Sequence, residues 1–348
     1  MASTELPRLA VRSPADLIAA VPYLLGFHPA ESVVVVAMRG RRVVFAARAD
    51  LPDPAEDPGA PLRHLAHVVG RQRADAATVV GYGPAHRVTP AVDAARDALA
   101  EAGLVLLDAL RVTDGRWWSY LCDEAGCCPP EGRRYDPGAS EITASAVYAG
   151  QVALPDRDAL VAQVAPVDGA AREAMRRATA EAEQRLARLL GEAPADDPLG
   201  GGPVRAAGVA AVREALRRQR RGERLGDDEV AWLSLLLTRV PVRDHAWERT
   251  DGRDRDIRLW TDVLRRAEPE LIAAPASLLA FAAWRAGQGA LAAVALERAL
   301  AEHPDYSLAL LLDDLLRRGV PPSELDGWPV VGPPGVVGSR RRRRRPAR

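Results

Sequence analysis

The first half of the chain alternates short apolar runs with amphipathic segments. Residues 33–36 are four valines in a row, which is typical of a strand buried on both faces. A second strand is expected at 43–49, close enough in sequence to pair with the first as a hairpin. A strand at 78–82, a helix ending near 102 and a strand at 104–112 have the order of a βαβ unit. This half therefore predicts a mixed sheet with hairpins and one βαβ unit.

Proline and capping residues mark the expected helix starts in this half. Ser13-Pro14 combines an N-cap with a proline at the first helical position, and Gly26 follows where that helix should end. A further helix is expected over 61–73. Thr89-Pro90 likewise places a hydroxyl residue before a proline, so it predicts the beginning of the helix within the βαβ unit.

The strongest local signal is a second hairpin. Asp114-Gly115 lies between two strand-like runs and is typical of a two-residue type I′ loop. The resulting register pairs Val112 with Trp117 and Leu107 with Cys122. Because that face is apolar, Cys122 is expected to point into a core.

From about residue 168 the apolar positions recur at helical spacing. Helices are expected over 170–190, 204–221, 227–240 and 254–267, the third of them ending at Pro241. The whole pattern predicts an α+β or α/β domain over 9–165 and an all-α domain over 166–330, with a flexible loop at 191–203 and a disordered basic tail at 331–348.

The helical part ends in a stretch with tetratricopeptide-like spacing. Residues 276–318 contain the pattern A-x3-L-x2-A-x4-P, which is typical of the second half of such a unit. Small side chains there allow two antiparallel helices to approach closely. A single unit of this kind is rarely stable by itself, so this hairpin is expected to pack against the preceding helices. The expected packing positions are Leu279, Ala280, Ala292, Leu296, Ala299 and Pro304.

Composition narrows the function classes. All 47 basic residues are arginine, because the chain contains no lysine, and it contains no asparagine either. A Walker-A lysine, a Schiff-base lysine and a Cys-His-Asn triad are therefore excluded. No apolar run is long enough to span a bilayer, and the first residues lack the pattern of a signal peptide. A cytoplasmic protein without a membrane partner is expected.

The candidate chemistry is concentrated in "SYLCDEAGCCPPEG", residues 119–132, which holds all three cysteines. A zinc site would use Cys122, Cys127 and Cys128 with a fourth ligand from elsewhere, and His28 in "GFHPAES" is the preferred candidate. The adjacent thiols of Cys127 and Cys128 are not expected to reach one ion easily. Two alternatives remain open: a disulfide between Cys122 and either Cys127 or Cys128, or three free thiols. With free thiols the protein would hold no metal cofactor. The other histidines considered as ligands are His64, His67 and His86.

Two arginine-containing segments could bind anions. "GYGPAHR", residues 81–87, lies between a strand and a helix, although Pro84 removes one backbone donor. The C-terminal tail could neutralise nucleic-acid phosphates, but it carries no aromatic residue for base stacking, so a nucleic-acid partner is not favoured. The tail residues concerned are Arg340, Arg341, Arg342, Arg343, Arg344 and Arg345.

Three stretches together resemble a known family. They are "RSPADLIAAVPYLLGFHPAESVVVVAMRGRRVVFAARADLP", the cysteine segment, and "GQGALAAVALERALAEHPDYSLALLL". Over roughly residues 9–325 the chain resembles an actinobacterial family of uncharacterised proteins, domain of unknown function 4192. The resemblance implies a soluble cytoplasmic protein and carries over no catalytic residue.

Three functional hypotheses follow from these observations. The first is a non-catalytic interaction or regulatory protein that binds another protein through a groove of the repeat-like hairpin. The second is a thiol- or metal-dependent enzyme centred on Cys122, Cys127 and Cys128. The third is weak nucleic-acid binding through the arginine tail.

Overall fold

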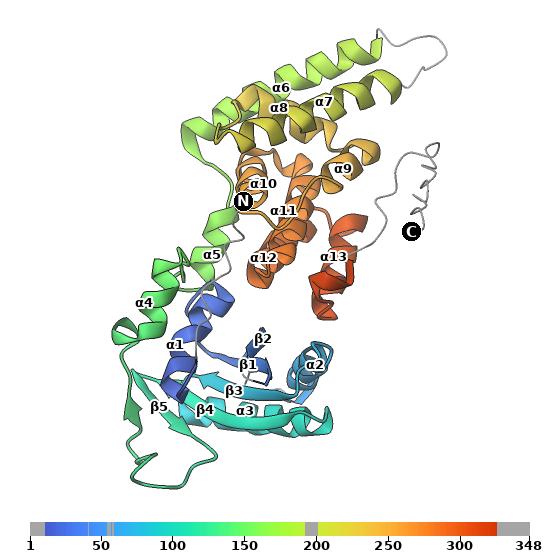
Figure 1. Ribbon diagram of the computed structural model, residues 1–348. Helices are drawn as coiled ribbons and strands as arrows, with labels where there is room; N and C mark the ends of the chain where they lie inside the picture. The colour runs from blue at the N-terminus through green and yellow to red at the C-terminus, as the bar shows by residue number, and fades with distance from the viewer. Residues whose placement is uncertain (1–10, 41, 54–56, 58, 192–200, 326–348) are drawn as a thin grey trace, which may run out of the picture.

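The computed structural model describes residues 11–40, 42–53, 57, 59–191 and 201–325. Its N-terminal part is built around one six-stranded sheet in the order β2-β1-β3-β4-β5-β6 (Figure 1). β3 and β4 are parallel and every other neighbouring pair is antiparallel, which confirms the mixed sheet with hairpins and one βαβ unit. The strands are β1 (Ser32–Arg39), β2 (Arg42–Asp50), β3 (Ala76–Tyr82), β4 (Val105–Thr113), β5 (Arg116–Ser119) and β6 (Arg133–Arg134).

Helices cover both faces of this sheet. The helices of this part are α1 (Pro14–Leu25), α2 (Gly59–Gly70), α3 (Ala85–Glu101), α4 (Glu141–Tyr148) and α5 (Arg157–Val164). Alternate valines of β1 face opposite layers, because side chains alternate along a strand. Val33 and Val35 pack with α2 and α3, whereas Val34 and Val36 pack with α1. The valine run is therefore buried on both sides, as predicted.

The second part of the chain is all helical and has its own core. Its helices are α6 (Gly169–Gly191), α7 (Gly201–Arg220), α8 (Asp227–Leu236), α9 (Val240–Trp247), α10 (Asp254–Arg266), α11 (Ala273–Arg285), α12 (Gly289–Glu302) and α13 (Ser307–Arg317). α11 lies at the centre, with every residue from Ala273 to Trp284 buried. α6, α7 and α8 form the end of the molecule farthest from the sheet (Figure 1). Residues 192–200 of the expected loop at 191–203 lie outside the described residues.

Two prolines lie at other helical positions than expected. The helix α3 starts at Ala85 with Pro84 as its N-cap, so Pro90 lies inside the helix and not at its start. Pro241 does not end a longer helix: α8 stops at Leu236, and Pro241 occupies the first turn of α9. Proline is tolerated in a first turn because the amide that it lacks would have no partner inside the helix.

In the described residues, the two parts touch through α5, through Phe27 and through Gln72. Phe27 forms an isolated bridge with Leu154, and its side chain is buried in the helical core. The amide of Gln72, just after α2, donates to the carbonyl oxygen of Gly319, just after α13, at 2.5 Å. The side chains of Leu160 and Val164 on α5 also belong to the helical core, so α5 packs with the helices that follow it.

Candidate metal centre

The three cysteines lie in the loop between β5 and β6. The hairpin before this loop forms as predicted: Asp114 and Gly115 both have positive φ (51° and 68°), and Val112 pairs with Trp117. β5 ends at Ser119, so the register does not continue to the expected pair of Leu107 and Cys122. The loop is thus anchored on each side by a short strand, β5 before it and β6 after it. Between these strands its conformation depends on hydrogen bonds outside the sheet.

The three sulfur atoms converge. The Sγ atoms of Cys122, Cys127 and Cys128 lie within 4.8 Å of one another. Both Cys127 N and Cys128 N donate to the carbonyl oxygen of Glu124, at 2.9 and 2.6 Å, and this tight turn carries the two adjacent thiols back towards Cys122. The expectation that adjacent cysteines would not present both sulfurs to one centre was therefore wrong, because it took no account of this turn.

Side chains of β5 and β6 hold the loop in place. Three side chains donate to carbonyl oxygens of its backbone. Each donor comes from a strand residue, so hydrogen bonds from the sheet hold the loop in addition to the packing of Cys128 against the core. Arg116 donates to Glu131 O (3.0 Å) and Gly132 O (2.9 Å), Trp118 Nε1 to Pro130 O (2.9 Å), and Arg133 to Gly126 O (2.9 Å) and Cys127 O.

Gly132 closes the loop against the ring of Trp118. Its φ is +76°, in the left-handed region, and a Cβ atom there would lie 2.3 Å from the nearest ring atom of Trp118. The guanidinium of Arg111 lies over the same indole, 3.8 Å from its centroid. The backbone conformation and the close approach of the ring together explain why this position requires glycine.

Local hydrogen bonds give two of the thiols opposite roles: the sulfur of Cys122 accepts hydrogen bonds and the thiol of Cys128 donates one. The Glu124 backbone N–H and the thiols of Cys128 and Cys127 lower the pKa of Cys122, against a smaller opposing effect of desolvation. Burial, followed by the hydrogen bonds to Cys122 and Cys127, raises the pKa of Cys128 to about 12. Cys122 is therefore the first of these two to become a thiolate, the form that binds metals and attacks electrophiles.

The burial of the cysteines differs from the sequence prediction. Cys122 is only partly buried and is not part of any core cluster of the described residues. Cys128 instead packs against the core between the sheet and α1, next to Tyr135. β5 ends at Ser119, so Cys122 lies in the loop and does not pair with Leu107, whose own side chain is 50% exposed.

No histidine joins the thiols in the described part of the chain, where the group of converging ligands consists of the three cysteines alone. His28 is exposed in the connection from α1 to β1, and its backbone N–H donates to Leu154 O at 2.9 Å. His64 and His67 lie on the exposed face of α2, and His86 is exposed in α3. Three protein ligands leave the fourth position of a tetrahedral ion to water or to a ligand from outside.

The other candidates from the sequence lie elsewhere. Arg87 of "GYGPAHR" is engaged within the turn: it lies 3.8 Å from the carboxylate of Glu31 and donates to Pro52 O at 3.2 Å. Five of the expected hairpin positions are at most 1% exposed in α11 and α12, whereas Pro304 is exposed. These five are Leu279, Ala280, Ala292, Leu296 and Ala299. Arg340 to Arg345 lie outside the described residues.

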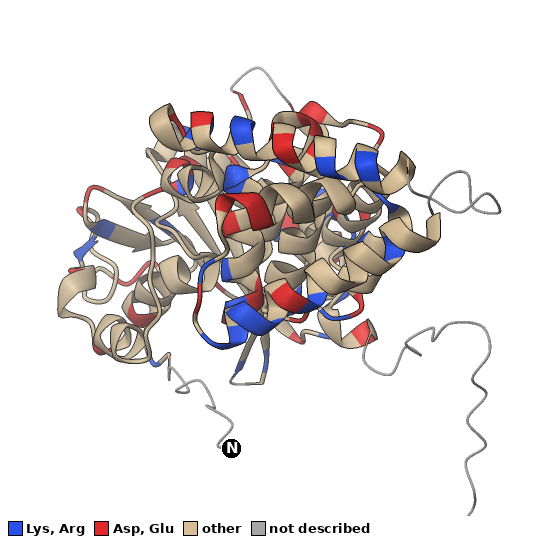
Figure 2. Cartoon of the chain, turned by 90° about the horizontal axis from the view of Figure 1, so that it is seen from above, with Lys and Arg blue, Asp and Glu red and all other residues tan. Residues whose placement is uncertain are grey.

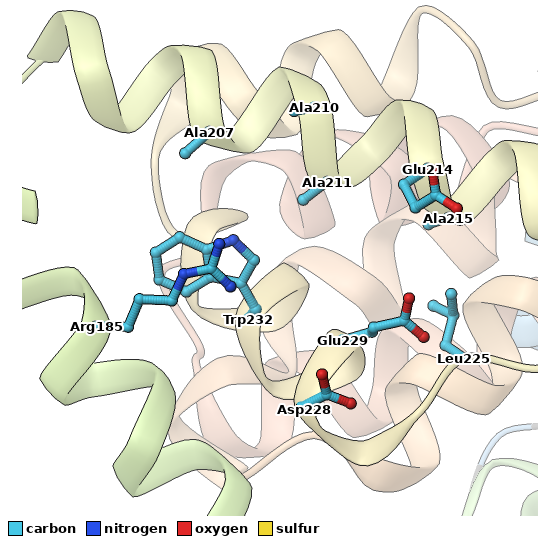
Figure 3. Close-up of a pocket in the computed structure, with 10 residues that line it drawn as sticks. All are labelled: Arg185, Ala207, Ala210, Ala211, Glu214, Ala215, Leu225, Asp228, Glu229 and Trp232. Carbon is cyan, nitrogen blue, oxygen red and sulfur yellow. The ribbon is translucent and has the colours of Figure 1, made fainter.

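A cavity of about 350 Å³ between α6, α7 and α8 was not expected from the sequence (Figure 3). Arg185 stacks on Trp232 at one end, 4.2 Å from the ring centroid. The carboxylates of Glu214 and Glu229 at the other end are paired with Arg217 and Arg218. Arg185, Glu214 and Glu229 are thus engaged with the protein itself.

The residues that hold the cysteine loop were not predicted from the sequence. Arg116, Trp118 and Arg133 belong to no metal-binding or catalytic motif, so their spacing gave no sign of their role. A usable signal was present, since arginine and tryptophan flanking a proline- and glycine-rich loop are suited to donate to its unpaired carbonyls.

Comparison with known proteins gives one family match. The model of the family described as "Domain of unknown function (DUF4192)" matches residues 14–323. Neither a curated protein nor a solved structure matches the chain. In the described part of the chain, no helix combines the length and the apolar character that crossing a bilayer requires.

Proposed function

Because the chain belongs to the family described as Domain of unknown function (DUF4192), whose description names no activity, we propose its function from its own geometry. The protein binds a thiophilic metal ion, with Zn²⁺ as the best match, through the sulfurs of Cys122, Cys127 and Cys128. The observation that carries this proposal is the convergence of three sulfur atoms within 4.8 Å.

The distances suit a tetrahedral ion after a small contraction. Zn–S bonds of about 2.3 Å place sulfurs on a tetrahedral ion about 3.8 Å apart. Sulfurs already within 4.8 Å of one another need to close by about 1 Å at most. The binding ion would release the protons of the thiols, including that of Cys128, so affinity should rise with pH. The fourth coordination position would be open to water or to another ligand from outside the chain, as in zinc sites with three protein ligands.

This proposal ranks above the interaction groove because of exposure. A groove on the repeat-like hairpin needs an exposed surface, and α11 is buried from Ala273 to Trp284. The cysteine loop, by contrast, is at the surface, with Cys127 exposed. A role in binding another protein is then best placed at the metal loop, where a partner's side chain could supply the fourth ligand.

The test is metal stoichiometry on the purified chain. We expect about one Zn²⁺ per chain after reconstitution, and thiolate-to-metal charge-transfer absorption after replacement by Co²⁺. The variant Cys127→Ser/Cys128→Ser should lose both signals. His28→Ala is the matched control and should keep them, since its side chain is not part of the thiol group. A chain that takes up no metal, or a cysteine variant that keeps it, would rule the site out.

A second candidate is reversible thiol oxidation, favoured by the lowered pKa of Cys122 beside two further thiols. Hydrogen peroxide would oxidise the Cys122 thiolate to a sulfenic acid and, with one proton from solvent, be reduced to water. The thiol of Cys128 or Cys127 would then attack that sulfur, form a disulfide and release the sulfenic hydroxyl with the thiol proton as a second water. Loss of two of the three titratable thiols after one equivalent of hydrogen peroxide, reversed by dithiothreitol, would support this role.

A further inference from the structure

Arginines surround a depression in the helical part of the molecule, away from the thiol loop. Acidic and basic positions are interspersed along most helices (Figure 2), so a site with an excess of one sign is distinctive. The depression has a volume of about 220 Å³ and lies between the second half of α7 and the turn from α9 to α10. Its lining residues are Arg213, Leu216, Arg220, Arg249, Arg253, Arg255 and Asp256.

Two of these arginines have no acidic partner. Arg213 and Arg220 are seven residues apart on α7, hence on one helix face, and both are exposed. Among the described residues no carboxylate lies within 4.0 Å of either guanidinium. Their charges are therefore directed at solvent from one wall of the depression.

The three arginines of the opposite wall are weakly paired. Arg249 contacts Glu248 at 3.2 Å and Arg253 contacts Asp251 at 3.6 Å. Arg255 lies 3.8 Å from the carboxylate of Asp256. Only the Arg249 pair is within hydrogen-bonding distance, and all but one of the carboxylates are on the surface, so each guanidinium keeps donors to offer.

The carboxylate of Asp256 accepts a hydrogen bond from the backbone of the turn. It is 2% exposed and accepts the N–H of Asp251 at 3.1 Å. Its burial raises its pKa, the desolvation outweighing the neighbouring arginines. Its role is thus to shape the wall, and it offsets only part of the positive charge.

The turn that presents Arg249 and Arg253 is rigid. Thr250, between them, is buried; its Oγ1 accepts from Trp260 Nε1 at 2.9 Å and donates to Ala246 O at 2.9 Å. Gly252 packs against the end of α11 so closely that a Cβ would lie 2.5 Å from the carbonyl carbon of Arg285. The arginines are therefore held on a fixed platform, which reduces the entropy lost when a ligand binds.

One further feature adds positive potential to this region, and the pKa of a neighbouring histidine responds to it. Arg253 is the N-cap of α10, so the positive end of a 13-residue helix faces the depression. Desolvation, followed by the charges of Arg249 and Arg213, lowers the pKa of nearby His245. The same arginines thus act on an independent group within the fold.

We propose that this depression binds the diphosphate group of a small phosphorylated molecule. Guanidinium groups match phosphate oxygens in pairs, and helix N-termini add backbone donors. Several arginines exceed the charge of one phosphate, which favours two linked phosphates. The volume is below that of most pockets for drug-sized ligands, and Leu216 is the single apolar lining residue, so the rest of the ligand lies outside.

The experiment is calorimetric titration of the full chain with pyrophosphate. We expect the double variant Arg213→Gln/Arg220→Gln to bind at least about a hundredfold more weakly, because each substitution removes a charge-assisted hydrogen bond that contributes about tenfold. The matched control is Arg177→Gln/Arg188→Gln, which removes two exposed arginines of α6 outside the depression. It should bind as the parent chain does. Circular dichroism of each variant checks that the helices remain.

Further titrations identify the source of the diphosphate. Equal affinity for pyrophosphate and ADP would indicate that the phosphates alone are recognised, and tighter binding of ADP would indicate a nucleotide; both support the proposal. No pyrophosphate binding by the parent chain would overturn it, as would equal weakening in the control variant. Binding of duplex DNA alone would overturn it in favour of a nucleic-acid surface. Cys127→Ser/Cys128→Ser should bind pyrophosphate normally, which separates this site from the proposed metal centre.

Discussion

The three cysteines differ in how readily they lose a proton, and this difference can be measured at the scale of single residues. The lowered pKa of Cys122 means that its thiolate is populated at lower pH than that of an ordinary cysteine, whereas Cys128, with a pKa of about 12, stays protonated at neutral pH. Without metal, iodoacetamide should therefore modify Cys122 well before Cys128. Peptide mass spectrometry across pH 6 to pH 9, about the range in which ordinary thiols begin to ionise, records the order.

The same measurement carries its own control. Replacing Cys127 and Cys128 with alanine removes two thiol donors to Cys122, so its modification should shift to higher pH. The backbone donor from Glu124 remains, and the pKa should stay below that of a free cysteine. Equal rates for Cys122 and Cys128 at neutral pH would contradict the hydrogen-bond arrangement described above.

Gly132 offers a second test at this scale. Alanine there would combine left-handed strain of about 1–2 kcal/mol with a clash against the ring of Trp118. We expect Gly132→Ala to displace the loop and weaken Zn²⁺ binding about tenfold or more. Gly126→Ala is the matched control in the same loop, because its φ is not positive and a Cβ atom there meets nothing within 4 Å. Similar affinities for the two variants would show that the Trp118 contact does not position the thiols.

At the scale of elements, local signals were predictable and the convergence of side chains was not. The loop Asp114-Gly115 and the N-cap Ser13 each depend on residues within a turn of each other, and both form as predicted. Pro90 misled because Pro84 and the turn before it supply the actual start of α3. This error is local, because two start signals lie within two turns of each other and the earlier one begins the helix.

The site shows the same division. The sequence identified the three cysteines, but it gave the inward position to Cys122 although Cys128 occupies it. That outcome depends on where β5 ends and on carbonyl contacts from Arg133, which has no periodic signal. The arginine-lined depression was missed entirely, because its walls come from helices that are apart in sequence.

Packing between α7 and α9 gives a prediction for helix contacts. A Cβ at Gly208 would lie 2.3 Å from a methyl group of Val242, which is fully buried. Overpacking of this kind costs about 1–3 kcal/mol, and the better helix propensity of alanine returns up to about 1 kcal/mol. Gly208→Ala should therefore destabilise the chain by about 1–2 kcal/mol in urea unfolding.

The double variant tests the cause of that destabilisation. Gly208→Ala/Val242→Ala removes the methyl groups that collide, so its destabilisation should be smaller than the sum of the two single effects by at least about 1 kcal/mol. Strict additivity would mean that the two helices separate without strain. Gly70→Ala in α2, where a Cβ atom meets nothing within 4 Å, should keep stability or raise it by up to about 1 kcal/mol.

At the scale of the whole molecule, the sheet part meets the helical part at α5, at Phe27 and beside α2. α5 packs on α10 and α12, and Arg157 at its start pairs with Glu297 of α12 at 2.5 Å. Phe27 places its ring in the helical core from a segment that pairs with Leu154, where His28 N donates to Leu154 O and Leu154 N donates to Gly26 O. The hydrogen bond of Gln72 to Gly319 joins the parts near the ends of α2 and α13 (Figure 1). Each part has its own apolar clusters, so the joints determine whether they unfold together.

Phe27 is the side chain that best tests this coupling. Phe27 lies in the segment between α1 and β1, and its ring packs in the helical core, where it is 3% exposed. Truncating a buried phenylalanine costs about 3–5 kcal/mol. Because the ring packs in the helical core while its backbone belongs to the sheet part, Phe27→Ala should separate one cooperative unfolding transition into two. Tryptophan fluorescence reports on both parts, through Trp117 in the sheet and Trp260 in α10.

Single-tryptophan backgrounds make the outcome unambiguous. In the parent chain, urea midpoints followed at the two tryptophans should coincide, as two-state unfolding requires. In Phe27→Ala the midpoint at Trp260 should fall below that at Trp117, because the helical core loses the ring. Tyr148→Ala, at a side chain 94% exposed, controls for loss of an aromatic group without loss of packing and should leave both midpoints in place. Midpoints that fall together in Phe27→Ala would show that the joint is strong enough to keep both parts in one folding unit, and separate midpoints in the parent chain would show that the joint never coupled them.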